Sequence, residues 1–101
     1  MNDNKECIKI LVDYDYEFEK NDKYSTTFDK LIAIRTGEYS AYGRIYVQVN
    51  YMGIYTVEFK ILSDMLRKEK DYELIKELLN EFGKELEKIK PYFVNYYNDW
   101  K

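Results

Sequence analysis

The amino-acid sequence predicts a single α+β domain in which an antiparallel sheet precedes C-terminal helices. Apolar and polar residues alternate over most of the first 61 positions, a helical apolar spacing begins near residue 71, and the 101 residues include only 4 Gly and 1 Pro. We expect a four-stranded β-meander over about residues 7–61, followed by two or three helices packed on one sheet face. A chain of this length suits one domain, residues 1–101.

The stretch from Cys7 to Glu19 alternates at a period of two and predicts a long first strand. One side, the apolar one, carries Ile8, Ile10, Val12, Tyr14, Tyr16 and Phe18. The other side carries Lys9 and Leu11 and then ends in four acidic residues. We therefore expect a strand with one apolar face and one acidic face, and we expect Cys7 to be a small buried or half-buried residue. The residues assigned to the acidic face are Asp13, Asp15, Glu17 and Glu19.

The stretch from Tyr24 to Thr36 fits either of two elements. As a strand, it places its apolar side chains on one face, with Lys30 breaking the pattern. As a helix, it carries an apolar stripe that Gly37 would end. Its β-branched Ile and Thr residues favour the strand.

Residues 42–61 predict a β-hairpin, because odd-numbered apolar residues alternate with polar ones on both sides of Gly53. A three-residue loop, residues 51–53, with Gly53 in the left-handed conformation, keeps both apolar sets on the same sheet face. This register pairs Val49 with Tyr55, Val47 with Val57 and Ile45 with Phe59.

The main helix is expected at residues 71–90, with Asp71 as its N-cap. A shorter helical turn would precede it from Ser63, and Pro91 would end it and could begin a third helix. Glu81–Lys84 and Glu85–Lys88 are spaced to form ion pairs along the helix. The predicted apolar stripe consists of Leu74, Ile75, Leu78, Leu79, Phe82, Leu86 and Ile89. The aromatic residues expected to pack back on the sheet are Phe93, Tyr96, Tyr97 and Trp100.

The composition excludes several kinds of site. The chain has no His and 1 Cys, which excludes Ser-His and Cys-His nucleophiles and a zinc site. Gly-rich phosphate loops, dinucleotide fingerprints and EF-hand loops are missing from the sequence. We therefore expect a protein that is not an enzyme and uses no cofactor.

The Cys content and the hydropathy of the sequence indicate the cellular compartment. A single Cys allows no internal disulfide, and the sequence shows neither a signal-peptide pattern nor an apolar run of about 20 residues. These observations favour the cytoplasm. The net charge of −3 disfavours direct binding to nucleic acid or to an anionic membrane.

The acidic residues of the first strand are the predicted functional site. A solvated face or a divalent-cation site would also use carboxylates, but like charges in a row repel each other and suggest an external partner. We expect this face to bind a basic protein or nucleoprotein complex. Tyrosines are enriched at interfaces, so Tyr39, Tyr42 and Tyr46 are assigned to the same site as Asp13, Asp15, Glu17 and Glu19.

In its small size, acidity, absence of His and abundance of Tyr, the chain resembles inhibitors encoded by phages and mobile elements, including anti-CRISPR proteins. This resemblance implies a nucleic-acid mimic that occupies a basic, nucleic-acid-binding channel of a bacterial defence complex. One alternative function is a structural module that self-associates through its sheet, for example as a homodimer. A second alternative is a small-molecule or metal-binding domain.

Overall fold

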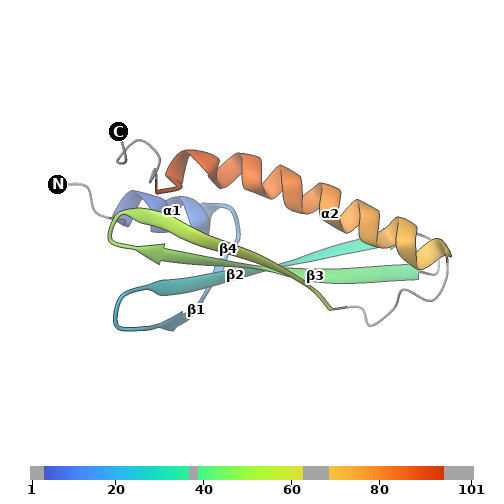
Figure 1. Cartoon of the computed structure of the whole chain (residues 1–101), viewed down its shortest axis with the longest axis horizontal. Helices are drawn as coiled ribbons and strands as arrows, with labels where there is room; N and C mark the ends of the chain where they lie inside the picture. Colours follow the sequence, from blue (N-terminus) through green and yellow to red (C-terminus); the bar gives the residue numbers. More distant parts are fainter. Residues whose placement is uncertain (1–3, 37–38, 63–68, 95–101) are drawn as a thin grey trace.

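The computed structural model describes residues 4–36, 39–62 and 69–94, and within these ranges the side chains of residues 36, 39 and 69–71 are not described. The elements are α1 (Lys5–Asp13), β1 (Glu17–Asn21), β2 (Thr26–Thr36), β3 (Tyr39–Asn50), β4 (Gly53–Ile61), α2 (Glu69–Ile89) and a 3₁₀ turn η1 (Lys90–Tyr92). The four strands form one antiparallel sheet in the order β1-β2-β3-β4. Both helices lie on the same side of this sheet (Figure 1), which confirms the predicted α+β class and the four-stranded meander.

The predicted first strand is wrong over its N-terminal part. Residues Lys5–Asp13 form α1, so the sheet begins at Glu17 and not near residue 7. Cys7 and Leu11, four residues apart, are buried on one side of this helix, whereas Val12, a predicted inward residue, is 56% exposed. The stretch also contains the helical spacing, because Cys7 and Ile8 lie four and three residues before Leu11, and burial follows that spacing.

Helix α1 ends in a Schellman motif that separates it from the sheet. Asp15 has a φ of 70°, the left-handed conformation found just after many helices. The Asp15 N–H donates to the Val12 carbonyl at 3.0 Å, and the Tyr16 N–H donates to the Leu11 carbonyl at 2.9 Å. Tyr16 and Leu11 are both buried, which adds the hydrophobic contact typical of this motif.

The strand interpretation of residues 24–36 is confirmed by β2, and the predicted β3–β4 register is confirmed in part. Val47 pairs with Val57 and Ile45 with Phe59, but Val49 pairs with Ile54 in place of Tyr55. The extra residue therefore sits in β4 as a bulge, and the loop shortens to residues 51–52. Gly53 has a positive φ of 140°, in the range that favours glycine.

The turn between β3 and β4 is fixed by the side chain of Asn50. Its Oδ1 accepts hydrogen bonds from the Met52 N–H at 2.8 Å and the Gly53 N–H at 3.1 Å. An Asn side chain that bonds the backbone two residues on replaces a backbone turn bond. This local bond accounts for the shorter loop.

The described C-terminal residues contain one α-helix, α2, and the turn η1, where two or three helices were predicted. Ser63 and the aromatic residues Tyr96, Tyr97 and Trp100 lie outside the described residues, as does the side chain of Asp71. The apolar stripe of α2 is rotated from the prediction, because Leu79 is 50% exposed while Glu85 is 7% exposed. Neither helix of the described residues is long and apolar enough to span a membrane.

The core lies between the helices and one face of the sheet, called here the inner face. Leu11 of α1 and Ile89 of α2 pack against Val47 and its neighbours, and Leu78 packs with Ala41 at the other end. Helix α2 runs over β2 and β3. No described helix covers the opposite face, called here the outer face (Figure 1).

Candidate functional site: the outer face of the sheet

The structure does not place the four predicted carboxylates on one strand face. Asp13 is the last residue of α1, and Asp15 is the left-handed residue that follows it. Glu17 and Glu19 lie on β1 and are the two of the set that reach the sheet. The shared acidic face is therefore wrong, because it required one continuous strand from Cys7 to Glu19.

Acidic residues do meet on the outer face, but they come from different strands. Glu17 pairs with Asp29, Asp29 with Tyr46, and Tyr46 with Glu58. Paired residues share a face, so these four side chains form a row across the sheet. Sequence reasoning missed Asp29 and Glu58, although the predicted pairing of Val47 with Val57 already placed residue 58 opposite residue 46.

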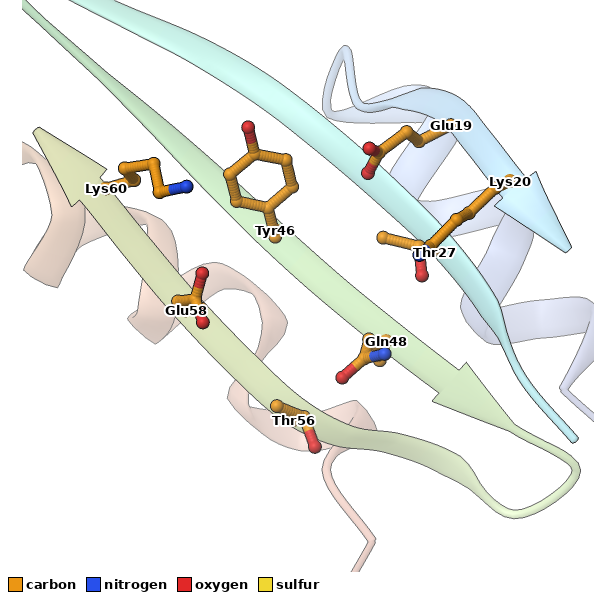
Figure 2. Close-up of a pocket in the computed structure, with 8 residues that line it drawn as sticks. All are labelled: Glu19, Lys20, Thr27, Tyr46, Gln48, Thr56, Glu58 and Lys60. Atoms are coloured by element: carbon orange, nitrogen blue, oxygen red, sulfur yellow. The ribbon is translucent and has the colours of Figure 1, made fainter. Parts of the chain in front are cut away.

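A hollow of about 300 Å³ adjoins this row and is called here the Tyr46 hollow. Figure 2 shows Tyr46 standing on β3 between Lys60 on one side and Glu19 on the other. The register shift between Phe18 and Lys20 lets Glu19 and Lys20 both reach the hollow from β1. Its lining residues are Glu19, Lys20, Thr27, Tyr46, Gln48, Thr56, Glu58 and Lys60.

The charges of the outer face are only partly neutralised. Asp29 forms an ion pair with Arg44 at 3.4 Å, and Lys20 lies 3.9 Å from Asp22. Glu17, Glu19, Glu58 and Lys60 form no ion pair with other described residues. The unpaired charge around Tyr46 is therefore negative on balance, which suits a cationic group of a partner.

The floor of the hollow carries an unsatisfied hydroxyl. Thr27 is 4% exposed, and its Oγ1 has no hydrogen-bond partner in the described part of the chain. A buried polar group without a partner costs about 1–3 kcal/mol. A polar group that reached this hydroxyl would recover part of that cost.

Of the predicted tyrosines, Tyr42 and Tyr46 lie on the outer face of β3. A hydrogen bond with Ser40, and then the positive charge of Arg35, lower the pKa of Tyr42. Tyr39 begins β3, but its side chain lies outside the described residues. The structure thus places two of the three tyrosines on the same face as Glu17 and Glu19.

A second charged cluster lies on the inner face, around Glu85 of α2. Its Oε1 accepts hydrogen bonds from Lys30 Nζ at 3.0 Å and from the Tyr16 hydroxyl at 3.2 Å. Its Oε2 accepts one from Lys88 Nζ at 3.0 Å. Burial, followed by the charge and the hydrogen bond of Glu85, raises the pKa of Tyr16. Both carboxylate oxygens are occupied by protein groups, so this cluster holds α2 on the sheet.

Metal and thiol chemistry find little support among the described residues. Within them, no three His, Cys, Asp or Glu side chains gather closely enough to hold a metal ion. Cys7 is buried, as predicted, and burial raises the pKa of its thiol to about 11. The thiol is therefore protonated near neutral pH and a poor nucleophile.

No family model, curated protein or solved structure matches the chain. A function can therefore be inferred only from the fold and the chemistry of the surface. The most distinctive surface is the outer face, where an aromatic ring, unpaired carboxylates and a buried hydroxyl meet beside a hollow.

Proposed function

We propose that the protein is a small binding module that docks the outer face of its sheet, centred on Tyr46, on a basic surface of another protein. The observation that supports this most directly is the row of Glu17, Asp29, Tyr46 and Glu58 on a face that no described element covers. Three of these groups are acidic, and only Asp29 is neutralised by a described cation.

Each part of the surface has a distinct role in this proposal. The Tyr46 ring supplies contact area at low entropic cost, as tyrosines do at the centre of interfaces. Unpaired carboxylates attract Lys and Arg of the partner and raise the encounter rate by about 10-fold or more at low salt. Inhibition of a nucleic-acid-binding protein is the form of this function that the sequence favours, because the same Lys and Arg would otherwise bind phosphates.

The proposal can be tested with a basic peptide as a stand-in for the partner, for example acetyl-(Gly-Arg)₄-amide. Amide chemical shifts would be followed by NMR during titration at about 50 mM and about 300 mM salt. We expect the shifts to concentrate at Glu19, Tyr46 and Thr27. The apparent affinity should fall steeply with salt, because the contacts are ionic.

Charge reversal separates this face from the overall charge. Glu17→Lys with Glu19→Lys should weaken peptide binding by about 10-fold. Glu73→Lys with Glu77→Lys changes the net charge equally on the exposed side of α2 and should weaken it by less than about 2-fold. Equal losses in the two double variants would mean that the peptide responds to net charge alone, and the proposed site would be rejected.

A further inference from the structure

The two edges of the sheet are protected to different degrees. The β1 edge is short, exposed at all five of its residues, carries Glu and Lys side chains and contains a register shift, all features that discourage pairing with another chain. The β4 edge is covered at its start, where the Val94 N–H donates to the Ile54 carbonyl at 2.8 Å. Beyond Tyr55, no other described segment pairs with this edge.

The inner side of β4 is also apolar and incompletely covered. Val57, Phe59 and Ile61 are only half-buried, because α2 lies over β2 and β3. A groove of about 390 Å³ opens between β4, α2 and Phe93. An edge whose backbone groups no described segment pairs beyond Tyr55, with half-buried apolar side chains along the same strand, is typical of a strand that accepts another.

We propose that two copies of this chain pair their β4 strands antiparallel about a two-fold axis at Phe59. The axis would stand perpendicular to the sheet, so that the two sheets become one and all helices stay on the same side. Phe59 would then face its own copy, and Val57 would face Ile61 of the partner subunit. On the outer side, Glu58 would face the partner's Lys60, and Lys60 would face the partner's Glu58.

Charge complementarity selects this register and this occupant. An axis at residue 58 would set the two Glu58 side chains opposite each other, and an axis at residue 60 would do the same with Lys60. Like charges directly opposite each other destabilise a strand pair, whereas opposite charges stabilise it. An axis at Phe59 instead pairs each Glu58 with the Lys60 of the other copy. The strand is then complementary to itself, as an interface between two identical chains must be.

This dimer does not depend on the proposed function. The seam lies at β4 and uses Glu58 and Lys60, which also line the Tyr46 hollow, while Glu17, Glu19 and Tyr46 lie on β1 and β3 outside the seam. A seam of one strand pair buries less than the ~1,200 Å² of a standard interface, so we expect a weak dimer. The two proposals share Glu58 and Lys60 but are tested by different readouts: a constant mass would reject the dimer alone, and loss of the salt-dependent peptide shifts at Tyr46 would reject the binding face alone.

Sedimentation equilibrium on the whole chain tests the dimer, from about 1 µM to about 500 µM protein and at about 0.5 M salt, where surface charges are screened. The mass should rise with concentration from the 12.3 kDa of one chain towards twice that value. Val57→Lys, which places a charge in the seam, should raise the dissociation constant by at least about 10-fold. Leu31→Lys adds the same charge to the outer face of β2, where Leu31 is 47% exposed, and should leave it within about 2-fold. A constant mass of 12.3 kDa over the whole range would overturn the proposal.

Cysteine cross-linking tests the register and stays informative if Val57→Lys fails to fold. Glu58→Cys and Lys60→Cys chains would be oxidised separately and as a mixture. Residues 58 and 60 face each other only between copies, so the mixed disulfide should form at least about 5-fold faster than either self-disulfide. The native Cys7 competes poorly, because it is buried. Equal rates in the three samples would exclude pairing about Phe59.

Discussion

Lys30 and Glu85 each interrupt an apolar pattern, and the structure brings the two residues together. Lys30 lies on the inner face of β2, and Glu85 lies in the buried stripe of α2, with 3.0 Å between Nζ and Oε1. A buried charge is tolerated when it is paired and hydrogen-bonded. A Lys on the apolar side of one element and a Glu on the apolar side of another therefore predict an ion pair between the two elements. No such prediction was made from the sequence for Lys30 and Glu85.

The protonation of Glu85 links this cluster to acid stability. Burial acts to raise the pKa of its carboxyl, but hydrogen bonds from Lys88 and Lys30, together with their charges, lower it overall. A carboxyl with a lowered folded pKa stabilises the protein above its unfolded pKa of about 4.3. That contribution is lost as the pH falls through the folded pKa.

We predict that Glu85→Gln lowers the free energy of unfolding by about 1–3 kcal/mol at neutral pH. The variant should also lose less stability than the original protein between about pH 5 and pH 3, since it has no carboxylate to protonate there. Urea unfolding across this pH range measures both effects. Glu81→Gln, which removes the exposed pair with Lys84, should cost less than about 1 kcal/mol. Similar losses in the two variants would show that burial adds nothing to the Glu85 pairs.

At the scale of elements, α1 shows how one stretch of sequence fits two periods. Residues 7–13 alternate well enough for a strand. The helix and the strand differ in which residue of a pair such as Leu11 and Val12 is buried, and in the structure it is Leu11. Its end is marked by Asp15, a less common left-handed residue than Gly. The absence of Gly at that position is why the sequence did not predict a helix boundary there.

Alanine substitutions at Leu11 and Val12 distinguish the two structures. In α1, Leu11 is fully buried and Val12 is 56% exposed, whereas the predicted strand had Val12 inside and Leu11 outside. We predict that Leu11→Ala costs about 2–5 kcal/mol of unfolding free energy and that Val12→Ala costs less than about 1 kcal/mol. Denaturant unfolding measures the free energy of unfolding of both variants. A larger loss of that free energy for Val12→Ala than for Leu11→Ala would contradict the helix and support the predicted strand.

At the scale of the whole molecule, the sequence predicted the meander, most of the β3–β4 register and the position of α2. These features depend on local periodicity and turn chemistry, which one sequence carries. The arrangement of the candidate site depends on which strands lie side by side, which the sequence does not show. Glu17, Glu19, Tyr42 and Tyr46 were named from the sequence, while Asp29 and Glu58 join the outer face through cross-strand pairing.

In our proposal the inner face of the sheet stabilises the fold and the outer face binds the partner. Two adjacent residues of β3, Tyr46 and Val47, test these separate roles. Val47 points to the inner face and is fully buried, whereas Tyr46 points to the outer face and lines the hollow. We predict that Val47→Ala lowers the free energy of unfolding by about 1.5–3 kcal/mol, from lost burial and a residual cavity. Tyr46→Thr replaces an aromatic residue with a β-branched one, both of which favour strands, and should cost less than about 1 kcal/mol.

Binding should show the opposite order. Tyr46→Thr removes the aromatic centre of the proposed interface and should weaken binding of the basic peptide by about 5-fold or more. Val47→Ala should leave it within about 2-fold while the protein is folded, because no atom of Val47 reaches the outer face. Urea unfolding and the NMR titration on the same two variants provide the measurements. If Tyr46→Thr lost as much stability as Val47→Ala and kept its peptide affinity, Tyr46 would be a structural residue and the outer face would not be the docking surface.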